Sequence, residues 1–151
     1  MTVHRIARLA LSCVLVIFCG CGGGKASDDD LKAAQGIWNL SSSQGYQLFG
    51  PPDGAWTIAK LTITGGKYTT TRNNGREDSG DITLDASTDP KRCTFTGFHR
   101  DDKPRLAIYD LSGNTLRVCM FDGDHSSPDY HAQRPSKLEP AEHVIVYTFT
   151  R

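Results

Sequence analysis

Short runs of alternating apolar and polar residues constrain the fold of this chain more than any other feature. From residue 36 onward, runs rich in Thr, Ile, Val, Tyr and Phe are separated by turn residues at a spacing of about 8–12 residues, which is typical of all-β proteins. The expected strands are 36–42, 57–64, 67–73, 79–85, 92–98, 105–110, 115–121 and 143–150. A short helical turn is expected before them at 29–35, with Asp28–Asp30 at its start.

The period of two also predicts which side chains face the core. The expected inward set is Trp38, Leu40, Leu61, Ile63, Ile82, Leu84, Leu106, Ile108, Leu116, Val118, Met120, Ile145, Tyr147 and Phe149. One apolar and one polar face indicate an antiparallel sheet. Eight sequential strands with short turns close most simply into an up-and-down barrel, which leaves no sheet edge. Within it, Asn74-Gly75 predicts a type I′ hairpin turn.

Two cysteines lie in predicted strands and test this arrangement. Cys93 alternates with Phe95 and is expected to face inward, whereas Cys119 alternates with Arg117 and is expected on the exposed face. Their strands are next-but-one neighbours in a meander, about 9–10 Å apart. A disulfide requires Cα atoms within about 7 Å of each other. We therefore predict two unpaired thiols.

The first twenty residues are typical of an export signal. Residues 1–8 carry Arg5 and Arg8 and no acid, residues 9–18 are almost wholly apolar, and small residues follow. A basic start, an apolar run of about 7–15 residues and a small-residue cleavage site describe a secretory signal. The apolar run is shorter than the roughly 20 residues that span a bilayer.

The segment "FCGC" (18–21) resembles a bacterial lipobox, in which a small residue precedes a cysteine that receives a diacylglyceryl group. Gly20 fits the small position and Cys21 the lipidated one, so membrane lipid is the expected partner. The predicted organisation is a signal peptide at 1–20, a flexible tether at 21–30 and a barrel domain at 31–151. Gly22 resembles the outer-membrane sorting pattern, which predicts an envelope location on the periplasmic side. Simple secretion, a metal clip at Cys19 and Cys21, and a phosphate loop at "GGGKAS" are the alternatives.

Length and charge exclude some classes of function. Without residues 1–20 the chain keeps 15 of its 17 Lys and Arg and all 17 Asp and Glu, a net charge of −2. That balance gives no reason to expect a nucleic-acid partner. The remaining length suits one domain with a single core.

Several longer stretches carry a family resemblance. In chain order they are "LKAAQGIW" (31–38), "GDITLDASTDPKRCTFT" (80–96), "LAIYDLSGNTLRVCM" (106–120), "QRPSKL" (133–138) and "VIVYTFTR" (144–151). Their order and spacing resemble a planctomycete-expanded family of small secreted lipocalin-like domains of unknown function. That signature has a Q-G-x-W start, a middle Y-x-x-x-G-x-T-L-x-x-C and a terminal Arg after an apolar strand. The resemblance covers 31–151 and implies a lipocalin-like barrel.

The same resemblance implies a pair of residues that closes one barrel end. Gly36-Ile37-Trp38 is similar to the G-x-W of lipocalins, where an Arg from the last strand stacks on the Trp. Arg151 is placed to do so here, which would be a cation–π contact. The alternative is that Trp38 only fills the core and Arg151 is a solvated terminus.

The barrel interior separates two expected functions. An eight-stranded barrel can be filled by side chains or can hold one small ligand. The candidate ligand-lining residues are Tyr46, Phe49, Trp56, Tyr68, Phe95 and Tyr147. One hypothesis is a module that binds a small apolar or amphipathic molecule, with the aromatic residues of 43–56 as a lid. The other is a structural or protein-interaction module of the envelope with a filled barrel, whose 43–56 loop packs back onto it.

Other chemistry has weaker support. The loop 122–131 collects Asp and His residues, but lacks the Gly and Glu that a calcium loop places at its sixth and twelfth positions, so a polar surface loop is the favoured interpretation and no metal is predicted. Ser112, Ser126 and Ser127 have no nucleophile-elbow sequence around them. Cys119 has no assigned His or Asn partner. We predict neither catalysis nor a cofactor.

Overall fold

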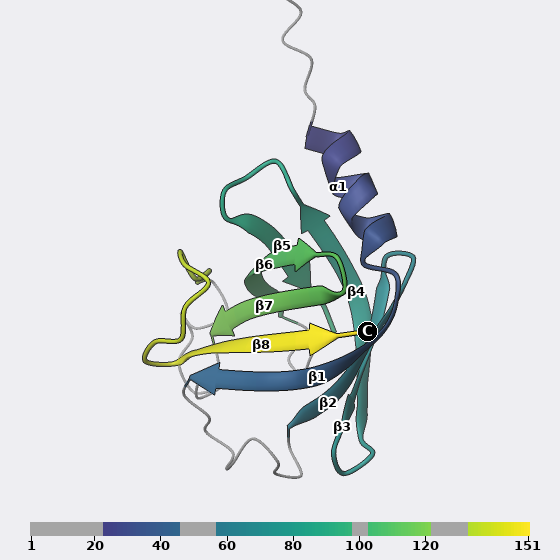
Figure 1. Cartoon of the computed structure of the whole chain (residues 1–151), viewed down its shortest axis with the longest axis vertical. Helices are drawn as coiled ribbons and strands as arrows, with labels where there is room; N and C mark the ends of the chain where they lie inside the picture. The colour runs from purple at the N-terminus through teal and green to yellow at the C-terminus, as the bar shows by residue number, and fades with distance from the viewer. Residues whose placement is uncertain (1–22, 46–56, 98–102, 122–132) are drawn as a thin grey trace, which may run out of the picture.

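The computed structural model describes residues 23–45, 57–97, 103–121 and 133–151, which form one helix followed by eight strands. The elements are α1 (Gly23–Ala33), β1 (Gly36–Gly45), β2 (Ile58–Thr64), β3 (Lys67–Arg72), β4 (Glu77–Asp85), β5 (Lys91–Phe95), β6 (Arg105–Ser112), β7 (Thr115–Phe121) and β8 (Val144–Thr150). Each strand pairs antiparallel with the next, and β8 pairs with β1 to close the barrel (Figure 1). The predicted all-β, up-and-down, lipocalin-like barrel is confirmed, and every expected strand is present within three residues at each end.

The helix begins earlier than predicted, and the tether interpretation of 21–30 is wrong for Gly23–Asp30. Asp28 and Asp29 therefore lie in the middle of α1 and not at its start. Two glycines near the beginning give this segment low helix propensity. Contacts with the barrel compensate, because the Ser27 hydroxyl accepts a hydrogen bond from the Ala86 amide at 3.1 Å and Leu31 packs against the core.

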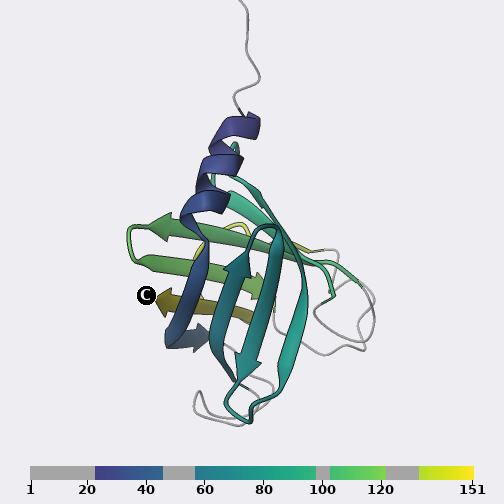
Figure 2. The ribbon, with the colours of Figure 1, turned by 90° about the vertical axis from the view of Figure 1, so that its right-hand side faces the viewer.

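The connections at the two barrel ends differ in length. At the end where α1 meets β1, the strands are joined across 65–66, 86–90 and 113–114. At the opposite end the connections are 46–57, 73–76, 96–104 and 122–143. Figure 2 shows α1 and the β4–β5 turn at one end of the molecule and the β3–β4 turn at the other. The helix thus marks the short-turn end.

The β3–β4 turn differs from the predicted type I′ turn. The Gly75 amide donates to the Arg72 carbonyl at 2.9 Å, and the Arg72 amide donates to the Arg76 carbonyl at 2.8 Å. Gly75 has φ 80°, whereas Asn74 keeps a negative φ. This is the pattern of a three-residue hairpin loop with glycine in the left-handed position. Here Asn74 instead accepts a hydrogen bond from the Arg76 amide at 3.0 Å.

The barrel core is continuous from the α1 end across all eight strands. Trp38, Tyr68 and Tyr109 are its largest fully buried side chains. The other buried members are Ala34, Ile58, Leu61, Ile63, Ile82, Cys93, Phe95, Ala107, Leu116, Val118, Met120, Ile145 and Phe149. The predicted inward set has members in six strands and is confirmed in five of them, because Leu40, Leu84 and Tyr147 also pack against this core.

The exception is β6, whose faces are reversed relative to the prediction. Ala107 and Tyr109 face the barrel core, while Ile108 belongs to a second cluster outside it. Residues paired directly across strands point to the same side of the sheet. Ala107 pairs with the inward-facing Cys93 on β5 and Met120 on β7, so it must also point inward. Both faces of "RLAIYDLS" carry apolar residues, so alternation alone predicted the wrong face of β6 to point into the barrel.

The second cluster lies on the outer face of β6, β7 and β8. Its buried members are Ile108, Cys119, Val144 and Val146, with Phe121 and Leu138 packed against them. Leu138 comes from residues 133–143, hereafter the strap, which crosses the outside of the barrel before β8. The prediction that Cys119 is exposed is therefore wrong: it points outward from the barrel, but its exposed fraction is 0%. Both Cys93 and Cys119 are buried free thiols.

Candidate functional site

The short-turn end is closed by the pair expected from the G-x-W pattern. Trp38 is fully buried, and its indole N–H donates to the Ala34 carbonyl at 2.8 Å. The Arg151 guanidinium carbon lies 4.4 Å from the centroid of the Trp38 ring, within cation–π range. Arg151 also donates to the Gln35 carbonyl at 3.0 Å. The last residue of the chain is thus fixed on the segment that joins α1 to β1.

Each of the three short turns is also tied to this end. Gln35 accepts a hydrogen bond from the Gly65 amide at 2.5 Å and donates to the Gly65 carbonyl at 3.2 Å. The Arg151 amide donates to the Asn114 carbonyl at 3.2 Å. Ser27 holds the third turn through Ala86. The end of the barrel next to α1 is therefore a connected, closed surface.

A polar cluster beneath α1 was not found by sequence reasoning. The Asp30 carboxylate accepts hydrogen bonds from the Tyr109 hydroxyl at 2.7 Å and from Lys91 Nζ at 2.8 Å. Lys91 also lies 5.8 Å from the centroid of the Tyr109 ring. Burial, followed by the hydrogen bond to Asp30, raises the pKa of Tyr109 well above its usual value. Tyr109 therefore stays a neutral donor, and the cluster attaches the helix to β5 and β6.

The barrel interior contains three of the six residues predicted to line a ligand. The rings of Tyr68 and Phe95 meet edge to face at 5.1 Å, and both residues are buried. Tyr147 stacks on Phe149 at 6.1 Å. Two cavities between these side chains and their neighbours measure about 10 Å³ each, the size of roughly one water molecule. A drug-sized ligand needs a pocket of about 300–1,000 Å³.

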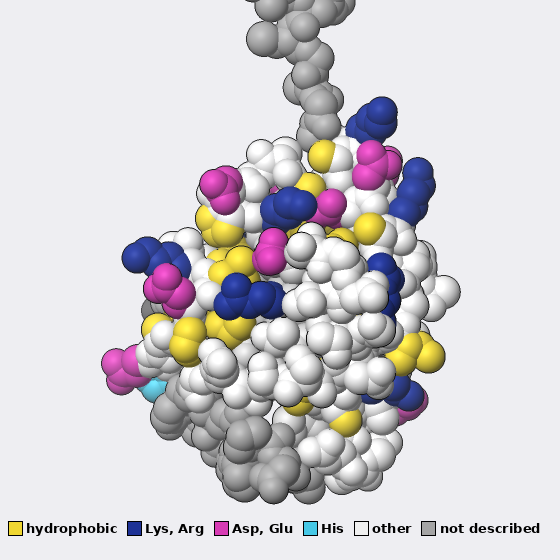
Figure 3. Space-filling model, in the orientation of Figure 1, with side chains coloured by type: hydrophobic (Ala, Val, Ile, Leu, Met, Phe, Trp, Pro, Cys, Tyr) yellow, Lys and Arg dark blue, Asp and Glu magenta, His cyan; other side chains and the backbone are white. Residues whose placement is uncertain are grey.

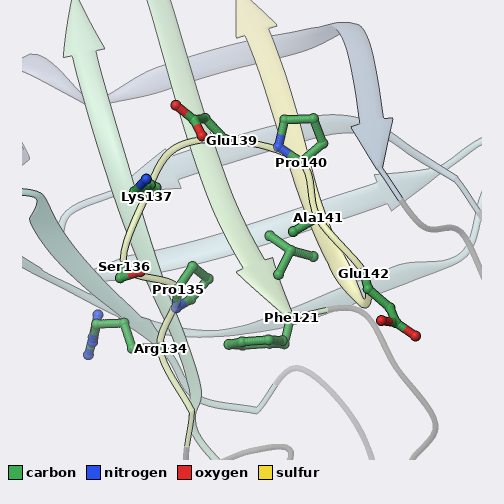
Figure 4. Close-up of a pocket in the computed structure, with 10 residues that line it drawn as sticks. Phe121, Arg134, Pro135, Ser136, Lys137, Glu139, Pro140, Ala141 and Glu142 are labelled. Carbon is green, nitrogen blue, oxygen red and sulfur yellow. The ribbon is translucent and has the colours of Figure 1, made fainter.

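A larger hollow lies outside the barrel, between the strap and the ends of β7 and β8; we name it the strap groove. It measures about 350 Å³ and is lined by Phe121, Arg134, Pro135, Ser136, Lys137, Glu139, Pro140, Ala141, Glu142 and Val144 (Figure 4). Figure 4 shows the Phe121 ring between the Arg134–Pro135 side of the strap and Glu142. An apolar floor with charges of both signs around it suits an amphipathic molecule or a peptide.

Arg134 fixes one side of the strap groove to the barrel wall. Its guanidinium donates to the carbonyls of Cys93 at 2.7 Å and of Ala107, and to the Thr94 hydroxyl at 3.2 Å. Further along the strap, the Lys137 carbonyl lies 3.4 Å from Cys119 Sγ, and the Leu138 carbonyl accepts from Arg117 at 3.0 Å. Arg134 belongs to the motif "QRPSKL", but the sequence did not indicate that its side chain binds β5 and β6.

The remaining predicted site residues lie outside the described part of the chain. They are Cys21, Tyr46, Phe49, Trp56 and the loop 122–131. Among the described residues, no group of three or more His, Cys, Asp or Glu side chains is placed to hold a metal ion. The described part also has no helix that is long and apolar enough to cross a membrane.

Fold and closed end together define the class of protein: a small lipocalin-like barrel with eight antiparallel strands, closed at one end by the contacts of Arg151 with Trp38 and Gln35. No protein-family model, curated protein or solved structure matches the chain.

Proposed function

We propose that this protein is an exported, non-catalytic lipoprotein, anchored through Cys21, whose filled lipocalin-like barrel serves as a structural or protein-interaction module of the cell envelope. The proposal includes membership of the lipocalin-like family that the sequence resembles. Export and lipidation are supported by the basic and apolar segments before "FCGC". The contact between Trp38 and Arg151 supports the family assignment.

The observation that carries the proposal is the small volume that the described side chains leave between them inside the barrel. Tyr68, Phe95 and Tyr109 belong to one buried core to which all eight strands contribute, and the two cavities that Phe95 lines measure about 10 Å³ each. A fatty-acid-sized molecule would have to displace several of these side chains. Interiors are packed at crystal-like density, so such displacement would disrupt many contacts at once. The scaffold thus favours recognition on its surface.

Titration with a fluorescent fatty-acid probe tests this proposal. The purified wild-type protein is expected to show no saturable binding at micromolar probe, and native mass spectrometry is expected to show no co-purified ligand. Phe95→Ala is the matched positive control, because Phe95 lines both internal cavities and its truncation joins them. Saturable binding by the wild type whose affinity changes in Phe95→Ala would place the probe inside the barrel and contradict a filled interior.

The strap groove favours a second candidate function, the binding of a small amphipathic molecule outside the barrel. Its volume of about 350 Å³ lies within the range of ligand pockets. Ala141→Trp would fill the groove from an exposed strap position. If this function is correct, wild-type protein binds the probe, Ala141→Trp abolishes binding, and Phe95→Ala leaves it unchanged. Equal binding by wild type and Ala141→Trp would exclude the groove.

A further inference from the structure

The helix α1 is fixed to the barrel by contacts along most of its length. Ser27 bonds to the β4–β5 turn, Asp30 bonds to β5 and β6, and Leu31 packs on the core. Just past the helix, Ala34 has an exposed fraction of 1%. A helix held at successive turns to three parts of the barrel does not swing independently of it. The first turn, with Gly24, Lys25 and Ala26, is exposed and points away from the barrel (Figures 1 and 2).

Only one residue, Gly22, separates Cys21 from the start of α1. Two residue steps span at most about 7 Å, even when fully extended. The acyl chains of a lipidated Cys21 lie in the bilayer, so the first turn of α1 must lie close to the membrane surface. The position of a barrel joined rigidly to that helix is then set by the direction of the helix.

We infer that α1 is a rigid stem that holds the barrel end-on to the bilayer, with the first turn of α1 and the β4–β5 turn facing the lipid surface. The inference rests on the proposed lipidation of Cys21. The β3–β4 turn, at the other end of the barrel, is directed away from the membrane, where a soluble partner can reach it. The strap groove lies on the side of the barrel and stays accessible.

Charge does not supply an alternative way of binding the bilayer. On the face shown in Figure 3, basic and acidic side chains near α1 are interspersed rather than collected by sign. Lys32 Nζ lies 4.0 Å from the Asp29 carboxylate on the same helix, and Asp28 and Asp30 flank Asp29. Attraction to anionic lipids needs a cluster of Lys and Arg near the surface. The acyl chains therefore carry the attachment, which is expected to resist washing with high salt.

Energy transfer to a lipid-headgroup dye tests the orientation in the full, lipidated protein reconstituted into vesicles. A donor dye is placed on Ser87→Cys in the β4–β5 turn or on Asn74→Cys in the β3–β4 turn, both exposed positions. The native Cys93 and Cys119 are buried, so labelling is confined to the introduced thiol. Between the two turns, β4 has 9 residues, and at about 3.3 Å per residue it is about 30 Å long. Transfer is expected to be several-fold stronger from position 87.

A flexible insertion provides the matched variant. A Gly/Ser spacer of about 16 residues between Gly22 and Gly23 has a root-mean-square length of about 20–24 Å, comparable with the barrel itself. It is expected to abolish the difference between the two positions, whereas the same spacer appended after Arg151 leaves it intact.

Two results would overturn the inference, and they are distinguishable. If mass spectrometry shows acyl groups on Cys21 but energy transfer from positions 87 and 74 is equal, the orientation by α1 is wrong and the lipid anchor is retained. If the mature protein carries no acyl group on Cys21, the proposed anchor and the stem both fail.

Discussion

Arg151 shows how much one terminal side chain can connect. Its guanidinium lies over Trp38 and donates to Gln35, and its amide donates to Asn114. Those contacts join the end of β8 to the α1–β1 junction and to the β6–β7 turn. The residue itself is exposed, so each polar contact is screened by water and contributes little alone. Its effect comes from closing the barrel end at several points.

We predict that Arg151→Ala lowers the free energy of unfolding by about 0.5–1 kcal/mol, the range for a cation–π contact at an exposed site. Urea denaturation followed by Trp fluorescence measures this directly, because Trp38 is the ring that loses its cation. Arg151→Lys is expected to keep part of the stability and to lose the hydrogen bond to Gln35. An unchanged melting temperature in Arg151→Ala would show that the stack contributes nothing.

At the scale of elements, the strap gives this barrel a second hydrophobic layer. It covers the row formed by Ile108, Cys119 and Val146 on the outside of β6, β7 and β8. These strands are consequently buried on both faces. The sequence of a strand that is buried on both faces is a continuous run of apolar residues, without alternation of apolar and polar residues. Arg134, through two backbone carbonyls, holds the strap in place.

Arg134→Ala is expected to open the strap and to expose Cys119. Hydrogen bonds to charged groups contribute about 1.5–3 kcal/mol each to stability, so a loss of that order is expected. In a Cys93→Val background, labelling of Cys119 by a thiol reagent should accelerate under native conditions. Arg92→Ala on β5 is the matched control, because Arg92 is exposed and takes no part in the hydrogen bonds that hold Arg134. Equal labelling rates in the two variants would mean that Arg134 does not hold the strap.

The elements also show how far the sequence can be followed. All eight strands were found because alternation and turn residues are local signals. The faces of β6 were not, since Leu106 and Ile108 are as apolar as Ala107 and Tyr109, and only pairing with Cys93 and Met120 decides between them. The early start of α1 was missed for a similar reason: Gly23 and Gly24 disfavour a helix, and the barrel contacts that support it are distant in sequence.

At the scale of the whole molecule, the two buried thiols make the free energy of unfolding depend on pH in the alkaline range. Burial raises the pKa of Cys93 to about 12 and that of Cys119 to about 11. In the unfolded chain these thiols ionise near their usual pKa of 9.0. Above that pH the unfolded state binds fewer protons than the folded state, so the free energy of unfolding falls as pH rises.

The expected slope is about 1.4 kcal/mol per pH unit for each thiol, between pH 9 and the folded pKa. Urea midpoints measured from pH 8 to pH 10 at constant ionic strength give the slope. The double variant Cys93→Val, Cys119→Ala should lose most of this dependence below pH 10. Above pH 10, Tyr68 and Tyr109 add a further decrease, because burial raises the pKa of both. A double variant with the wild-type slope would contradict this assignment.

The sequence by itself determined the strands, their order and the closure into a barrel, because these follow from a period of two and from turn residues that act within a few positions of one another. It also placed Trp38 and Arg151 at opposite ends of the barrel sequence, where closure brings them together. Only the tertiary structure decided the orientation of β6, the burial of Cys119 beneath the strap and the attachment of α1 through Asp30. Each of these depends on residues 13 to 79 positions apart in the chain, and contacts at such separations leave no periodic trace in the local sequence.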